Sequence, residues 1–126
     1  MTDEALLSPF DEKLIAQVAN ANDIEVERLE TAVADHQRTM RENPGVEDLV
    51  YEWRKQYDDP VLLRRPDVFI VAVPPAVWEE YAEYLEFEDD LLAAVTAVHQ
   101  EQTIRTDAVE LADLSGRDTT LVATRE

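Results

Sequence analysis

The chain has two histidines, and each of them is followed by a glutamine. His36 lies in TAVADHQRTM and His99 in AVTAVHQEQT. Imidazole is a common metal ligand and general base, so this pair is the first candidate for chemistry. If the two side chains met, Glu30 or Glu101 would have to help bind a divalent metal, because two histidines alone make a poor zinc site. No HExxH-type spacing supports that site. We therefore expect both histidines to lie at a helix interface or at the edge of the core, each satisfied by a neighbouring backbone or carboxylate group.

Cationic side chains gather in one stretch, YEWRKQYDDPVLLRR, which spans residues 51–65. It holds four of the eleven Lys and Arg residues, interleaved with three aromatic ones. Arginine, tryptophan and tyrosine are the residue types that anchor protein interfaces. Alternatively, the aromatic residues belong to the core and the arginines pair with neighbouring carboxylates. We expect this stretch to be a surface for a protein or nucleic-acid partner, through Arg54, Lys55, Arg64, Arg65 and Tyr51.

The usual catalytic signatures are absent from the sequence. It has no cysteine, which excludes disulfides, thiolate metal sites and thiol nucleophiles. With only two glycines, Gly45 and Gly116, it has neither a glycine-rich phosphate loop nor a GxSxG elbow. The acidic run EEYAEYLEFEDD, residues 79–90, is typical of a solvated face rather than of an enclosed carboxylate pair. We therefore predict a non-enzymatic protein without a metal or other cofactor.

Helical patterns dominate the first half of the chain. SPFDEKLIAQVANA predicts a short helix with Ser8 as its N-cap. NDIEVERLETAVADHQRTMREN predicts a long helix in which Asn22 and Glu25 form a capping box, and NPG at 43–45 ends it. VEDLVYEWRKQY repeats the helical period and predicts a third helix over 46–57.

The pattern then changes to that of a β-hairpin. PVLLRRPDVFIVAV is rich in β-branched residues and is interrupted by Pro-Asp, so we expect two strands within 61–73 and the deepest burial at 68–73. Two more helices follow, separated by a break at 86–88. The predicted fold class is α+β and mainly α-helical, with about five helices and a central two-stranded β-hairpin. We expect one compact domain over 1–107 and a C-terminal tail or small hairpin over 108–126.

The two halves of the chain resemble each other. Residue 24 placed on residue 87 aligns the two long helices and superposes five identical residues, including both His-Gln pairs. Each long helix also follows a shorter one. The sequence therefore indicates a degenerate repeat of a helical hairpin, or reuse of the same architecture.

Acidic residues outnumber basic ones by 29 to 11, which gives the chain a net charge of −18. Such a chain repels itself in dilute buffer, whereas the Debye length at about 1 M salt is only about 3 Å. The acid-rich, lysine-poor composition resembles that of proteins from salt-accumulating halophiles. The N-terminus MTDEALL is acidic, unlike a secretory signal, and the longest apolar run is too short to span a bilayer. We expect a cytoplasmic protein without membrane attachment.

Residues 9–73 are similar in element order to a winged helix-turn-helix, in which three helices precede a strand, a turn and a strand. The resemblance implies nucleic-acid binding, with VEDLVYEWRKQY as the recognition helix and LLRRPDVF as the wing. The pattern departs from DNA-binding members at Glu47, Asp48 and Glu52, which would face phosphate groups.

We accordingly predict a small acidic, salt-adapted cytoplasmic protein that acts as a non-enzymatic regulatory or protein-interaction module. A protein partner is expected, and a homodimer through the hydrophobic hairpin is a further arrangement. One alternative is a winged-helix-like nucleic-acid-binding regulator, whose binding would weaken with salt. The other is a metal-dependent enzyme, which requires His36 and His99 to lie within ligand distance of each other.

Overall fold

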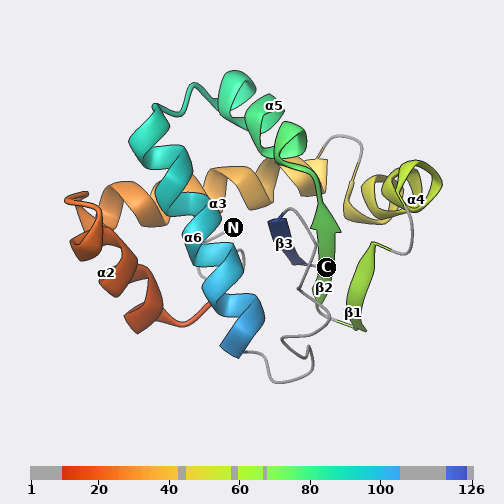
Figure 1. Ribbon diagram of the computed structural model, residues 1–126, viewed down its shortest axis with the longest axis horizontal. Helices are drawn as coiled ribbons and strands as arrows, with labels where there is room; N and C mark the ends of the chain where they lie inside the picture. The colour runs from red at the N-terminus through yellow and green to blue at the C-terminus, as the bar shows by residue number, and fades with distance from the viewer. Residues whose placement is uncertain (1–9, 43–44, 58–59, 67, 106–118, 125–126) are drawn as a thin grey trace.

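Five helices and a three-stranded antiparallel sheet make up the described part of the molecule (Figure 1). The computed structural model describes residues 10–42, 45–57, 60–66, 68–105 and 119–124. The predicted fold class, α+β and mainly helical, is confirmed. In chain order the elements are α2 (Glu12–Ala21), α3 (Val26–Glu42), α4 (Val46–Gln56), β1 (Val61–Arg65), β2 (Val68–Val73), α5 (Pro75–Leu85), α6 (Asp89–Arg105) and β3 (Thr119–Thr124).

The caps of the first helical pair differ from their prediction. Asp11 is the N-cap of α2, and its carboxylate accepts a hydrogen bond from the Lys13 N–H at 2.9 Å. Ser8, the expected cap, lies outside the described residues. Asn22 does not begin α3 but caps the C-terminus of α2, where its side-chain amide donates to the Val18 carbonyl at 2.8 Å. The reason is that the Asn22 N–H still belongs to the last turn of α2, 3.1 Å from the same carbonyl oxygen.

The turns within the two helical pairs have the same backbone geometry. Helices α3 and α6 both have 17 residues, and their first residues, Val26 and Asp89, are 63 positions apart. Asp23 and Glu86, also 63 apart, both have a left-handed φ of 60°. A left-handed residue beside a bond from residue i to residue i−5 is a Schellman C-cap. The predicted repeat therefore extends to the backbone. The bonds are Ile24 N–H to Ala19 C=O and Phe87 N–H to Ala82 C=O, both 2.9 Å.

The hairpin predicted within 61–73 is confirmed, and all six residues of β2 are buried, as expected for the middle strand of the sheet. The pairing of a third strand with β2 was not predicted. β3 pairs antiparallel along the whole of β2, from Val68 opposite Thr124 to Val73 opposite Thr119. The local pattern predicts for these residues a tail or a hairpin of their own, whose other strand, 109–114, lies outside the described residues. A local pattern cannot reveal a pairing between segments about fifty residues apart.

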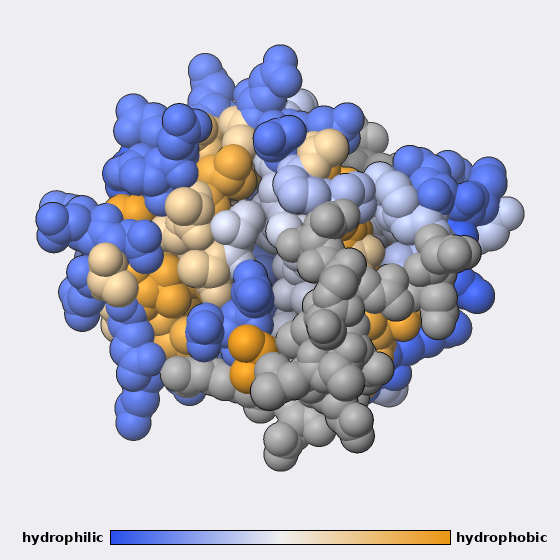
Figure 2. All heavy atoms as spheres, viewed as in Figure 1, coloured by the Kyte–Doolittle hydropathy of each residue, from blue (hydrophilic) through white to orange (hydrophobic). Residues whose placement is uncertain are grey.

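Helix α6 crosses the middle of the molecule and contacts α2, α3 and β3 (Figure 1). Leu29 and Val33 of α3 and Val95 and Val98 of α6 are completely buried in the shared core. Figure 2 shows apolar residues between α2 and α6, whereas hydrophilic residues lie along the left and upper rim and at the α4 end of this face.

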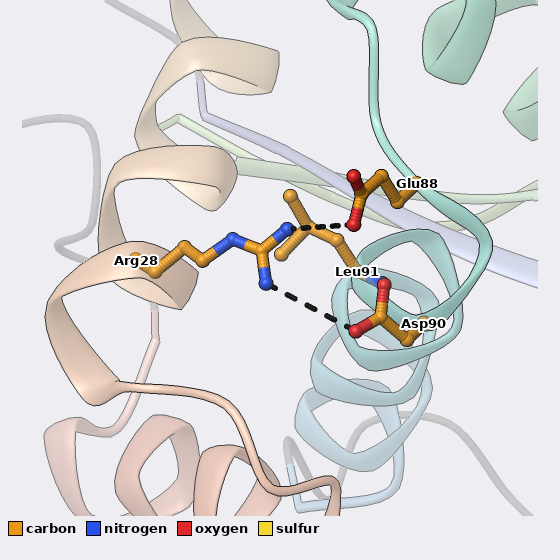
Figure 3. Close-up of polar contacts among 4 residues, drawn as sticks. All are labelled: Arg28, Glu88, Asp90 and Leu91. Atoms are coloured by element: carbon orange, nitrogen blue, oxygen red, sulfur yellow. Dashed lines mark hydrogen bonds and ion pairs between the residues drawn. The ribbon is translucent and has the colours of Figure 1, made fainter.

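An exposed ion-pair cluster marks the start of α6. Figure 3 shows Arg28 of α3 pointing at Glu88 and Asp90, with nitrogen–oxygen distances of 3.4 Å and 3.9 Å. The three side chains are 45%, 77% and 56% exposed, so each pair contributes less than about 1 kcal/mol to stability. The core, rather than this cluster, holds α3 and α6 together.

Candidate binding groove and buried histidine pair

His36 of α3 and His99 of α6 meet inside the molecule. Neither side chain is exposed, and their ring centroids lie 5.3 Å apart with the rings nearly perpendicular. Trp78 of α5 packs against both rings at 4.7 Å, and Tyr81 packs edge-on against His36 at 4.4 Å. Of the two expected positions, the histidines therefore occupy a helix interface and not the edge of the core. The stripes of α3 and α6 that carry the histidines face each other, and α5 covers the contact.

The two imidazoles differ in their hydrogen bonds. His99 Nδ1 accepts from the backbone N–H of Val122 in β3 at 2.9 Å, which places the proton of the neutral ring on Nε2. Gln37, next to His36, donates its side-chain amide to the Val122 carbonyl at 2.7 Å. One residue from each His-Gln pair thus binds the same β3 residue. Among the described residues, neither nitrogen of His36 nor Nε2 of His99 has a hydrogen-bond partner.

Burial keeps both imidazoles neutral. It lowers the pKa of His36 to about 3, and burial together with the nearby His36 lowers the pKa of His99 well below its ordinary value. Burial and the charge of Glu80 raise the pKa of the Tyr81 hydroxyl to about 12. No group of three His, Asp or Glu side chains within the described ranges is placed to hold a metal, so Glu30 and Glu101 do not complete the site considered above. The histidine pair therefore connects α3, α5, α6 and β3 through ring contacts and one hydrogen bond.

A groove of about 350 Å³ lies between α4 and the hairpin. Residues 47, 50, 51 and 54 of α4 follow the i, i+3, i+4, i+7 spacing that puts side chains on one face of a helix. β1 and the start of β2 form the opposite wall. Three of the five residues predicted to contact a partner lie here. The complete lining is Glu47, Val50, Tyr51, Arg54, Pro60, Val61, Arg64 and Phe69.

An irregularity in β1 decides which arginine faces the groove. The register between β1 and β2 shifts between Val61 and Leu63, as in a β-bulge. Arg64 stands opposite Phe69, so the two side chains lie on the same face of the sheet. Arg65 follows on the opposite face. Arg64 therefore lines the groove and Arg65 does not.

Lys55 also lies outside the groove lining. Its ammonium group is 3.6 Å from the Glu52 carboxylate and 5.2 Å from the centre of the Tyr51 ring. Of the predicted contact residues, the fold brings Tyr51, Arg54 and Arg64 together and separates Lys55 and Arg65 from the lining.

The two guanidinium groups of the groove are not neutralised by carboxylates in the described part of the chain. Arg64 lies over the Phe69 ring at 5.8 Å, and Arg54 makes no ion pair or hydrogen bond there. By contrast, Arg28 and Arg38 on α3 both pair with carboxylates. Planar guanidinium groups bind carboxylates and phosphates with two parallel hydrogen bonds. The groove can therefore accept an anionic group.

The apolar residues of this lining were not predicted as contacts. Val50, Val61 and Phe69 carry no motif, and the bulge that aims Arg64 leaves no recognisable pattern. The aromatic residues of 51–57 also divide between the two roles considered above, because Trp53 is buried in the core whereas Tyr51 is 62% exposed. The 3.6-residue period alone would have separated Tyr51 and Arg54 from Trp53.

Residues 8–125 match the family model described as "Domain of unknown function (DUF8048)". The chain belongs to this family. The match spans both helical pairs, the sheet and the groove. No curated protein and no solved structure matches the chain. None of the described helices is long and apolar enough to cross a membrane.

Proposed function

We propose that this chain is a non-enzymatic protein-interaction module that binds an anionic segment of a partner protein in the groove between α4 and β1. The observation that carries the proposal is the presence of two arginines, Arg54 and Arg64, that line one groove and have no carboxylate partner among the described residues, in a chain with 29 acidic residues. We place this activity in a salt-adapted cytoplasm, as the composition indicates.

An anionic ligand suits the groove because both of its cations are exposed and unneutralised. Acidic residues outnumber basic ones by 29 to 11, yet the guanidinium groups of Arg54 and Arg64 have no carboxylate partner in the described part of the chain. Val50, Val61 and Phe69 provide apolar contact at the base, and the exposed ring of Tyr51 stands beside Arg54 on α4. Arginine and tyrosine next to an apolar base are typical of the anchoring centre of an interface.

A protein segment is favoured over nucleic acid by the charges around the groove. Glu47 belongs to the lining, and Asp48 and Glu52 are exposed on the same helix, so these carboxylates confine the cationic part of the groove to the surroundings of Arg54 and Arg64. Nucleic acid binds along extended basic surfaces, because its affinity depends on neutralising many phosphates. Two unpaired arginines are enough for one or two carboxylates. The proposal needs no homodimer, since the apolar residues of β2 are already buried within one chain.

The experiment is fluorescence anisotropy of a labelled peptide of about nine alternating Asp and Val residues, titrated with the protein at about 0.5 M KCl, where long-range attraction is screened. We expect saturable binding that weakens at least about tenfold in the variant Arg54→Gln/Arg64→Gln, because about 1.4 kcal/mol or more of charge-assisted bonding is lost. The matched control is Arg28→Gln/Arg38→Gln, which removes the same charge from α3 and should leave the affinity unchanged.

A labelled DNA duplex in the same titration tests the winged-helix alternative. Duplex binding that is lost in Arg54→Gln/Arg64→Gln, together with no peptide binding, would replace the proposal by a nucleic-acid-binding function. Equal loss of peptide binding in both double variants would reduce the effect to net charge and contradict a specific groove.

A further inference from the structure

The two edges of the sheet differ in whether their outward backbone groups are hydrogen-bonded. The sheet order is β1-β2-β3, so β1 and β3 each have one side without a neighbouring strand. At β3, the outward N–H and C=O of Val122 are bound by His99 and Gln37. At β1, no described strand or side chain takes that place. An open edge is a template for pairing with another chain.

The pairing pattern fixes which β1 residue faces outward. In an antiparallel ladder the backbone groups of successive residues point alternately toward each neighbour. The Val122 groups point away from β2, so Val122 and its partner Ile70 do not bond to each other, and the Ile70 groups point toward β1. Ile70 therefore bonds Leu63, and the N–H and C=O of Arg64 point away from the sheet. The bond from Ala72 N–H to Pro60 C=O, 2.7 Å, follows the same alternation.

Arg64 thus offers two kinds of contact at one residue. Its backbone groups face the open edge, and its side chain lines the groove beside Arg54. In an antiparallel strand added to β1, the residue opposite Arg64 would exchange both backbone hydrogen bonds with it. The side chain of that residue would lie on the groove side of the sheet, because paired residues share a face.

We infer that the anionic segment binds as an extended strand added antiparallel to β1, with an Asp or Glu opposite Arg64. This inference rests on the proposed function and specifies its binding mode. Main-chain hydrogen bonds supply affinity in such strand addition, and the side chains that alternate along the added strand supply specificity. The carboxylate opposite Arg64 would reach the guanidinium groups of Arg64 and Arg54.

An acidic strand fits this edge better than a second copy of the chain. Antiparallel pairing of two β1 strands would bring arginines from both copies close together, and like charges across a strand pair destabilise it. The edge is also only five residues long, carries a bulge and ends in two arginines. Short, charged and bulged edges resist pairing with strands of the same kind. The same arginines select a strand of opposite charge.

The test uses the Asp-Val peptide in three forms and the full-length protein. In the first modified form the central Asp residues are N-methylated, which removes the N–H groups that would face β1. In the second, the same number of central Val residues is N-methylated, and these N–H groups would face solvent. Charge and composition of the side chains are identical in all three. We expect the Asp-methylated form to bind at least about tenfold more weakly, and the Val-methylated form to bind like the parent peptide.

Amide hydrogen exchange supplies a second readout on the protein. The Arg64 amide should exchange with solvent in the free protein and become protected when the unmodified peptide is bound. The Leu63 amide, which already bonds to Ile70 in the pairing described above, is the internal control and should be protected in both states. The variant Arg64→Gln keeps the backbone groups, so a residual difference between the two methylated peptides is expected in it.

The outcomes separate this inference from the proposed function. Equal binding of all three peptides would overturn strand addition and leave anion binding in the groove standing. Weaker binding of the Val-methylated form alone would overturn the placement of an acidic residue opposite Arg64. Failure of the unmodified peptide to bind would overturn the proposed function, and this inference with it.

Discussion

His36 and His99 occupy equivalent positions in the two helical pairs, yet their side chains make different interactions. His99 completes a hydrogen bond to Val122, whereas neither nitrogen of His36 has a hydrogen-bond partner among the described residues. His36 therefore acts as a ring in an aromatic cluster with Trp78 and Tyr81. Because a buried polar atom without a partner has a desolvation cost, the two positions should respond differently to an apolar replacement.

Replacement of each histidine by phenylalanine separates the two roles. His36→Phe removes no hydrogen bond and should leave the free energy of unfolding within about 1 kcal/mol of the parent, or raise it. His99→Phe leaves the Val122 N–H buried without an acceptor and should lower that free energy by about 1–3 kcal/mol. Urea unfolding at pH 7.5, followed by circular dichroism, measures both values. Equal losses in the two variants would contradict the assignment of the bond to His99 alone.

The lowered histidine pKa values predict acid sensitivity. The unfolded chain binds protons at imidazole below about pH 6.5, whereas the folded state holds His36 neutral down to about pH 3. Protons therefore favour the unfolded state as the pH falls below about 6.5, by up to about 1.4 kcal/mol per pH unit for each histidine. Above that pH neither histidine makes the free energy of unfolding depend on pH. Urea unfolding between pH 7.5 and 5 avoids most carboxylate titration and should give a slope that is about halved in His36→Phe. An unchanged slope in this variant would contradict burial of a neutral His36.

At the scale of the elements, the repeated turn is the feature that local sequence signals do not predict, because neither of its left-handed residues is a glycine. Asp23 and Glu86 adopt a left-handed conformation that glycine adopts more readily. The bonds that close the two turns nevertheless have the same length. The packing of α2 on α3 and of α5 on α6 must therefore offset the strain at each turn.

Glycine at position 86 should relieve this strain. We expect Glu86→Gly to raise the free energy of unfolding by about 0.5–1 kcal/mol, since a side chain at positive φ costs about 1–2 kcal/mol and glycine entropy returns part of it. Glu83→Gly, at an exposed position inside α5, is the matched control, because it removes the same charge and should lower the value by about 1 kcal/mol. The urea midpoint at pH 7 compares them. A loss in both variants would show that the turn is not strained.

At the scale of the whole molecule, net charge opposes the compact state. The ion pairs of Arg28, Arg38 and Lys55 involve side chains that are 41% to 77% exposed, so they offset little of the repulsion. The buried core must therefore supply most of the stabilisation, and dissolved ions must screen the remaining charge.

The midpoint of thermal unfolding should rise with KCl concentration. Between about 0.1 M and 1 M the Debye length falls from about 10 Å to about 3 Å, and we expect the midpoint to rise by about 5 °C or more. Most of the rise should occur in this interval, because screening is then nearly complete. A midpoint that is constant or falls with KCl would contradict a destabilising net charge of −18.

The sequence by itself determined the elements whose signals are local. The period of residues 46–57 predicted α4, the apolar run 68–73 predicted the buried strand β2, and the break at 86–88 separated α5 from α6. The sequence also indicated the repeat, through two His-Gln pairs at the same spacing, and it located the cations that surround the groove. Apart from the repeat, which compares segments 63 residues apart, each of these depends on neighbours within a few turns of helix or one strand.

Only the tertiary structure determined which strands and side chains are neighbours. The sequence could not reveal that β3 completes the sheet, that His99 and Gln37 bind one residue of that strand, or that a bulge turns Arg64 toward Arg54 and Arg65 away. These facts depend on contacts between residues far apart in the chain and on a one-residue change of register. The free energy of such contacts is set by the whole packed core, so no local pattern records them.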